Sequence, residues 1–483
     1  MVGYGGSETP LKNEGNNMNS HSFVYKRQIP RKGLNNAAVC SLLAVAGVFA
    51  LQVKAEVTLQ SSQVSLEYRG AINLRDSELD LSRVSLWSKH KLRLSPQWSA
   101  QIDTLSQVAF EETGLGSTDN YTSFNRPIVD NSETRVELTR AFLMWRKRAT
   151  SFVIGKQVTP WGVLDGVQVT DRFDPVRRRD FVFTDTRPER IARWGVRWRS
   201  KFDGWRVDTS FAFDGTSTQQ AKVGDTFFLT STRFTGGLSI TDLGLLGQES
   251  HSRLEQVLMI NTSKREHIIA HSTLGVKVGH ALGEGDMSFM LYRGPDTDPV
   301  LRLATAITAN APINVSFDYL RRTVIGATYD VTQDTLVWRM ELAYIPDQPL
   351  NVLAEVPLAQ ARSKRLLIGG GLDWSAPNNW FVNAQLVVDY LDKKQFELVR
   401  PSTDTLLTLR AQRSFFNARL LFKMELMGSV NQGDGALRPS ISYDYSDNLK
   451  LQTGIDWAFG DPNGQFGQFK DASRWWASVK YTF

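Results

Sequence analysis

The sequence predicts an all-β fold, a single transmembrane antiparallel β-barrel of 16 to 18 strands that spans residues 56–483. Three observations predict it: a terminal strand with one apolar face, a leader sequence at the amino end, and alternating apolar and polar residues between them. The mean hydropathy is −0.27, and no segment after the leader reaches the roughly 18 consecutive apolar residues of a membrane-spanning helix. Barrel strands are compatible with this value, because only every second residue faces lipid.

Residues 474–483 have the pattern of the strand that closes such a barrel. Successive side chains of a strand point to opposite faces, so one face here is apolar and the other polar. The chain stops at an aromatic residue with no polar tail, as expected at a membrane boundary. An edge strand of a soluble β-sandwich is the alternative. The apolar face holds Trp475, Ala477, Val479, Tyr481 and Phe483, and the polar face holds Arg474, Trp476, Ser478, Lys480 and Thr482.

Residues 1–55 are predicted to be an N-terminal extension and a cleaved secretory signal peptide. A basic segment precedes an apolar run at 37–51, and the small-residue site Val53-Lys54-Ala55 follows it. A retained anchor is the weaker interpretation, because this run is shorter than the about 20 residues of a membrane-spanning helix. Cys40 is the single cysteine of the chain, so a chain that begins near Glu56 has none.

The charge balance changes when this leader is removed. Residues 1–55 hold six of the 56 Lys and Arg and two of the 50 acids, which leaves 50 basic and 48 acidic residues. The sequence pI of about 9.2 therefore reflects mostly the leader. A nucleic-acid partner is not expected, because the remaining chain lacks the excess of positive charge that nucleic-acid binding requires.

Alternating segments recur along the rest of the chain. They are separated by short turns and by longer polar stretches such as 111–131, an asymmetry typical of membrane barrels. Sixteen or 18 strands fit the length, and barrels of this size leave an aqueous channel. Tryptophans near the ends of these segments, for example Trp98, Trp145, Trp205, Trp374, Trp380 and Trp457, are expected to form interfacial girdles. The predicted strands are 64–74, 83–94, 97–110, 133–145, 151–157, 191–199, 205–213, 226–240, 273–278, 286–292, 313–319, 323–331, 335–345, 365–374, 380–390, 406–412, 414–427, 437–445, 450–459 and 474–483.

Arginines concentrate between residues 172 and 199. In the predicted strand 191–199, Arg193, Arg197 and Arg199 alternate with apolar residues. An arginine facing lipid near the midplane costs about 2 to 4 kcal/mol, so these side chains are expected to face the lumen. They are the first candidates for pore-lining, substrate-binding residues, and Arg177, Arg178 and Arg179 are the second.

Two interpretations of these arginines stay open. Basic side chains in a pore favour anions, so the group is consistent with an anion-selective constriction. Alternatively, the arginines pair with lumenal carboxylates and hold the wall together; the candidate partners are Asp208, Glu341, Asp373, Asp389 and Asp456.

Residues 158–190 lack clean alternation and contain three prolines, Pro160, Pro175 and Pro188. Irregular backbone at membrane depth is tolerated only where protein covers it or where it lines a cavity. A constriction loop folded into the channel is one expectation, and an extracellular loop is the other.

Several motifs resemble one known family. They are 137–145, Gly155-Lys156-Gln157, Trp161-Gly162, Asp165-Gly166 and 171–180, together with closing segments from 438 to 483. These resemble a Gram-negative family of uncharacterised, porin-like outer-membrane proteins similar in style to the alginate exporter. The resemblance implies an outer-membrane β-barrel whose substrate is mostly unassigned.

The expected function is that of an outer-membrane channel passing small anionic solutes, with outer-membrane lipid and lipopolysaccharide around it. An exporter of an acidic polysaccharide, with a periplasmic partner, and a carrier of hydrophobic molecules are the alternatives. No enzyme motif and no cofactor are expected, since nucleophile elbows, paired cysteines and phosphate loops are missing. His267 and His271 lack the His-Glu-x-x-His order of zinc proteases, so no metal site is expected there.

Overall fold

The computed structural model describes residues 57–111, 115, 118–183, 189–222, 225–238, 258–262, 267–304, 313–393 and 395–483. The predicted leader, 1–55, lies outside the described residues. Among the described residues, no helix is long and apolar enough to cross a membrane.

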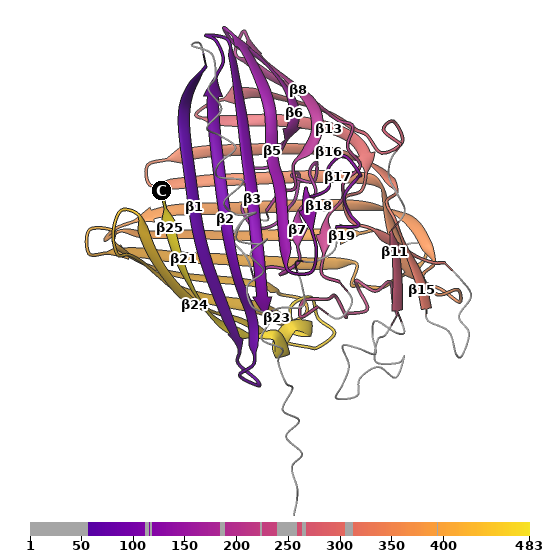
Figure 1. The fold of residues 1–483 in the computed structure, drawn as a ribbon. Coiled ribbons are helices and arrows are strands. Elements are labelled where there is room, and N and C mark those ends of the chain that lie inside the picture. The colour runs from indigo at the N-terminus through magenta and orange to yellow at the C-terminus, as the bar shows by residue number, and fades with distance from the viewer. Residues whose placement is uncertain are drawn as a thin grey trace, which may run out of the picture. The chain divides into compact units, whose positions relative to one another are not determined.

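The described chain forms one large antiparallel sheet that closes on itself. Two of its members, β4 (Val129–Asp130) and β20 (Glu397–Leu398), are two-residue pairings, and the other 18 strands form the ring. The first and last strands pair with each other from Ser65↔Thr482 to Asn73↔Arg474, which closes the barrel (Figure 1). The ring strands are β1 (Thr58–Asn73), β2 (Leu79–Arg93), β3 (Trp98–Glu111), β5 (Thr134–Lys147), β6 (Thr150–Gln157), β8 (Arg193–Phe202), β9 (Trp205–Ala212), β12 (Thr273–Leu282), β13 (Gly285–Pro295), β16 (Arg321–Gln333), β17 (Leu336–Leu353), β18 (Gln360–Ala376), β19 (Trp380–Leu391), β21 (Thr403–Phe415), β22 (Leu420–Ser429), β23 (Asp434–Asp444), β24 (Leu449–Phe459) and β25 (Arg474–Thr482).

The connections at one end of the ring are all short, whereas those at the other end range from short turns to long segments. Both termini of the barrel lie at the end where the turns are short, such as 148–149 and 203–204, while long segments such as 158–192 leave the opposite end. Turn residues there include Arg148, Asp203 and Gly204, all with positive φ. Transmembrane barrels have short turns at one end and long loops at the other, and the two ends of this ring differ in the same way.

Alternation along the strands separates an apolar outer face from a polar inner one. On β25, Trp475, Val479 and Tyr481 are exposed, whereas Arg474 and Ser478 are buried. The prediction for the terminal strand is therefore confirmed. At the short-turn end, Trp98, Trp205 and Trp374 are exposed close to strand ends, where an interfacial girdle would lie.

Several loops of the long-loop end fold back inside the ring. Trp161, Val169 and Phe173 of the segment between β6 and β8 form an apolar cluster with inward side chains of the wall, including Tyr292 and Leu367. A second cluster joins further loop residues to the wall and to a 3₁₀ helix, η1 (Gly467–Ala472). Its buried members are Phe183, Ala221, Phe227, Ala436, Ala458, Phe466, Phe469 and Ala472.

Three predicted strands differ from the structure. The described part of 226–240 forms turns, because its apolar residues pack inside the ring beside Phe183 instead of facing lipid. Residues 313–319 do form a strand, β15 (Ile313–Asp318), but it pairs with β11 (Leu258–Thr262) and β14 (Val300–Leu303) outside the ring. The segment 414–427 is interrupted by a turn at 416–418, where all three residues have positive φ.

The alternation predicts a different tolerance for arginine on the two faces of β21. Leu407 faces outward, whereas Gln412 lines a hollow at the short-turn end. Leu407→Arg should lower the free energy of unfolding in lipid vesicles by about 2 to 4 kcal/mol, because its charge would face lipid. Gln412→Arg should change it much less. The free energies of unfolding are measured by urea titration followed by tryptophan fluorescence. An equal decrease for the two variants would contradict the assignment of faces.

Candidate functional site

The segment between β6 and β8 is held inside the barrel by one carboxylate of the wall. Glu341 on β17 accepts hydrogen bonds from the backbone amides of Leu164 and Thr170, at 2.6 and 2.8 Å, and from the Thr170 hydroxyl at 2.6 Å. It also accepts one from the Val163 amide. A Cβ at Gly162 would lie 2.8 Å from Glu341 Oε1, so glycine is needed for this approach. The expectation of a loop folded into the channel is therefore met for residues 158–183.

Arg193 anchors the same segment from the next strand. Its guanidinium donates to the Phe173 carbonyl at 2.5 Å and to Thr273 Oγ1 at 3.1 Å, and Asp174 lies 3.7 Å away. It also stacks on the Phe173 ring at 5.1 Å. Since Arg193 is only 3% exposed, it faces inward as predicted, but it is enclosed by the segment that it holds.

Arg197 and Arg199 also face inward. Arg197 makes a two-pronged ion pair with Asp208, with Nε–Oδ1 at 2.8 Å, and donates to the Val158 carbonyl. Arg199 lines a hollow at the short-turn end. Of the three first candidates, Arg199 is therefore the one that lines open space.

Arg177, Arg178 and Arg179 lie on the inserted segment, where Arg177 and Arg178 form the two-residue strand β7 (Arg177–Arg178). The Arg177 guanidinium contacts both carboxylate oxygens of Glu137, at 2.7 and 2.6 Å. Arg178 pairs with Asp298 at 3.2 Å, and Arg179 lies 3.5 Å from its neighbour Asp180.

The charges of this segment influence one another. Burial opposes the charged form of Arg177, but the nearby Glu137 outweighs it and raises the pKa of Arg177. Burial likewise opposes the charged form of Asp180, yet the positive field of Arg179, Arg83 and other arginines lowers the pKa of Asp180. Both side chains are therefore ionised at neutral pH.

The carboxylates proposed as arginine partners are mostly paired. Asp208 binds Arg197, and Glu341 holds backbone instead of an arginine. Ion pairs join Asp373 to Arg339, Asp389 to Arg365 and Arg400, and Asp456 to Arg438 and Arg474.

Cations outnumber carboxylates in each of four of the hollows that described residues line. We call them the basic cavity, about 350 Å³, the mixed cavity, about 280 Å³, the large vestibule, about 1050 Å³, and the small vestibule, about 600 Å³. The large vestibule shares Arg69 and Lys480 with the basic cavity, and Arg410 and Arg438 with the mixed cavity. The small vestibule is lined by Trp161, which belongs to the first apolar cluster. The hollow that adjoins both inner cavities is therefore the large vestibule.

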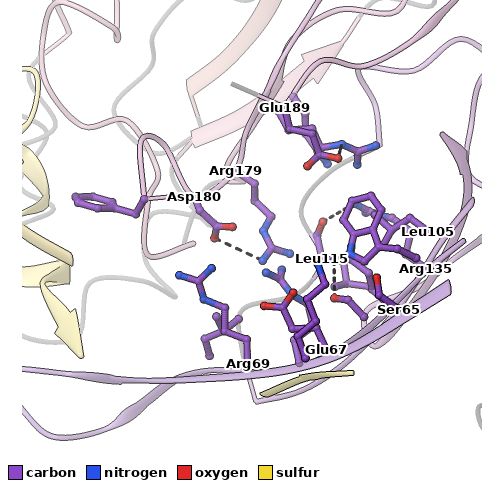
Figure 2. Close-up of a pocket in the computed structure, with 18 of the residues that line it drawn as sticks. Ser65, Glu67, Arg69, Leu105, Leu115, Arg135, Arg179, Asp180 and Glu189 are labelled. Carbon is purple, nitrogen blue, oxygen red and sulfur yellow. Dashed lines mark hydrogen bonds and ion pairs between the residues drawn. The ribbon is translucent and has the colours of Figure 1, made fainter. Parts of the chain in front are cut away.

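The basic cavity has the largest imbalance of charge. Figure 2 shows Arg179 and Asp180 of the inserted segment opposite Arg69 and Glu67 of β1. Arg69 stacks on Trp476 at 4.2 Å, and its Nε and Nη2 have no hydrogen-bond partner in the described part of the chain. The lining holds eight cations, Arg69, Arg83, Lys89, Arg135, Arg177, Arg179, Arg474 and Lys480, against three carboxylates, Glu67, Asp180 and Glu189.

Sequence reasoning missed most cations of this cavity. The signal was present, because Arg69, Arg83 and Lys89 occupy alternate, polar positions of β1, which pairs with the terminal strand, and of its neighbour β2. Arg69 and Arg83 are direct cross-strand partners, an unfavourable position for two like charges.

Metal binding finds no support in the described ranges. They contain no group of three or more His, Cys, Asp or Glu side chains placed to hold a metal ion. His271 Nδ1 lies 3.1 Å from the backbone carbonyl of His267.

The buried group around Glu137 should be important for stability. Glu137 is 1% exposed, and Lys156 Nζ lies 4.0 Å from it in addition to Arg177. Glu137→Gln should lower the free energy of unfolding by about 3 to 5 kcal/mol, because two buried cations lose their carboxylate. As the control, Asp471→Asn should cost at most about 1 kcal/mol, since its pair with Arg75 is exposed. Similar values for the two variants in urea unfolding would refute this ranking.

Comparisons with known proteins give one family and several similar structures. No curated protein sequence matches the chain. The outer membrane protein OpdK of Pseudomonas aeruginosa has a TM-score of 0.48 at 9% identity, covering 88% of this chain and 99% of that one. OccAB3 of Acinetobacter baumannii (TM-score 0.46) and a BenF-like porin from Pseudomonas fluorescens Pf-5 (0.47) are each 10% identical, again covering 88% of this chain and 99% of the other. The family described as "Protein of unknown function (DUF1302)" matches residues 98–369, more than half of the sequence, and the chain belongs to this family.

Proposed function

We propose that this protein is an outer-membrane channel that passes small anionic solutes. The observation that carries the proposal is the excess of cations in the basic cavity, eight against three carboxylates, next to the large vestibule. The low-dielectric wall around the lumen strengthens the positive field of these cations, and basic pore linings favour anions. The apolar outer face and the asymmetry of turns and loops support an outer-membrane location.

In this proposal the lumenal arginines have two different roles. Arg193, Arg197 and Arg177 hold the inserted segment and the wall through buried or partly buried contacts. Arg179 and Arg199 line hollows and join Arg69 in attracting anions. Arg178 pairs with Asp298 and faces the mixed cavity.

The alternatives receive different support. Apolar side chains line part of the mixed cavity, which gives some support to a carrier of hydrophobic molecules. Export of an acidic polysaccharide would need a wide and continuous basic path. The two apolar clusters occupy part of the interior that such a polymer would have to cross.

Conductance of single barrels in a planar bilayer under a salt gradient tests the proposal. The wild type should show a reversal potential of the sign for anion selectivity. Arg69→Gln/Arg179→Gln should shift it toward cation selectivity, because two charges leave the lining of the basic cavity. Arg75→Gln, with an exposed side chain at the opposite end of β1 from the short turns, should leave it unchanged. A folded barrel without conductance, or with a cation-selective wild type, would refute the proposal.

A further inference from the structure

One arginine of the mixed cavity differs from the others in its contacts. Arg172 of the inserted segment lines this cavity, and its Nε is buried with no hydrogen-bond partner. Its guanidinium makes no ion pair in the part of the chain that the structure describes. A buried charge without a partner is costly, so this position favours an anion from outside the chain.

The other cations of the mixed cavity already have carboxylate partners. Arg233 binds Asp404 at 2.6 Å, and Arg365 binds Asp389 at 2.7 Å. Arg178, Arg177, Arg410 and Arg438 pair with Asp298, Glu137, Glu425 and Asp456, respectively. Among the described cations that line this cavity, Arg172 is therefore the one without an ion-pair partner.

The rest of the cavity wall is largely apolar. The two apolar clusters meet here, because Leu406 packs against both of them. Leu367 and Val387 of the wall are buried in the first cluster, while Phe181 of the inserted segment and Met427 of the wall pack against the second. The volume, about 280 Å³, is close to the lower end, about 300 Å³, of ordinary small-ligand pockets.

We infer that the mixed cavity binds a small organic monoanion with an apolar body, whose carboxylate contacts Arg172 and whose body lies against Leu367, Leu406 and Met427. This inference rests on the proposed function, since it narrows the class of anion that the channel accepts. The shared Arg410 and Arg438 place the site next to the large vestibule, from which such a solute would enter or leave.

Calorimetric titration of the purified, folded barrel in detergent micelles tests this inference directly. Phenylacetate should bind saturably, while acetate, which lacks the apolar body, and 2-phenylethanol, which lacks the charge, should each bind at least about tenfold more weakly. Arg172→Gln should weaken phenylacetate binding by at least about tenfold and leave 2-phenylethanol binding unchanged. The Arg172→Lys variant keeps the charge but lacks the planar guanidinium. Its affinity for phenylacetate should lie between those of the wild type and of Arg172→Gln.

The matched control is Arg413→Gln. Arg413 also has an Nε without a partner in the described chain, but it lies over the Trp380 and Phe415 rings and lines none of the four hollows described above. The Arg413→Gln variant should bind phenylacetate with the same affinity as the wild type. The Arg172→Gln variant should fold normally, because the substitution breaks no ion pair or side-chain hydrogen bond among the described residues. Heat-modifiable gel mobility checks this.

The outcomes separate this inference from the proposed function. Phenylacetate binding that is insensitive to Arg172→Gln, or no tighter than acetate binding, would overturn the site even if the channel were anion-selective. Arg172-dependent binding in a barrel that does not conduct would support the site and refute the open channel. If Arg172→Gln does not fold, the comparison of the three ligands on the wild type and on Arg172→Lys still decides.

Discussion

The interior of this barrel depends on buried carboxylates that hydrogen-bond to irregular backbone. A segment without regular structure at membrane depth leaves amides that neither water nor a strand neighbour can satisfy. Glu341 accepts hydrogen bonds from such amides at Leu164 and Thr170. Asp434 accepts hydrogen bonds from the amides of Phe466 and Gly467 at 2.6 and 3.1 Å. These contacts allow loops to fill part of a ring of 18 strands, which by its size alone would enclose an open channel.

The inserted segments also determine what each lumenal arginine does. Where a segment covers an arginine, as at Arg193, two guanidinium nitrogens donate to a carbonyl and a hydroxyl and a carboxylate lies nearby, although Nε has no hydrogen-bond partner in the described chain. Where a hollow remains, as at Arg69 and Arg172, guanidinium nitrogens have no partner in the described chain. The arginines that line the hollows therefore come both from the dense cluster at 172–199, as Arg172 and Arg179 do, and from distant strands, as Arg69 does.

The fold was largely predictable from local pattern, because each barrel strand carries its own period-2 signal. The orientation of Arg193, Arg197 and Arg199 followed from that signal alone. Their partners did not, since contacts such as that of Glu341 with Leu164 join residues far apart in the sequence. Residues 226–240 show the same limit: an apolar alternation predicts a buried face but does not distinguish lipid from the interior of the ring. The cations of the basic cavity come from strands at both ends of the chain, and only closure of the barrel brings them together.

The sign of the electrostatic potential inside the barrel can be measured at a single position. Ser85 lines the basic cavity, and Cys40 is the only cysteine of the sequence, so Ser85→Cys in a Cys40→Ser background places one thiol there. The rates of its reaction with an anionic and a cationic methanethiosulfonate reagent of similar size, each relative to a free thiol, report the local potential. A positive interior predicts that the anionic reagent reacts faster. Faster reaction of the cationic reagent would contradict the central claim that uncovered arginines make this lumen selective for anions.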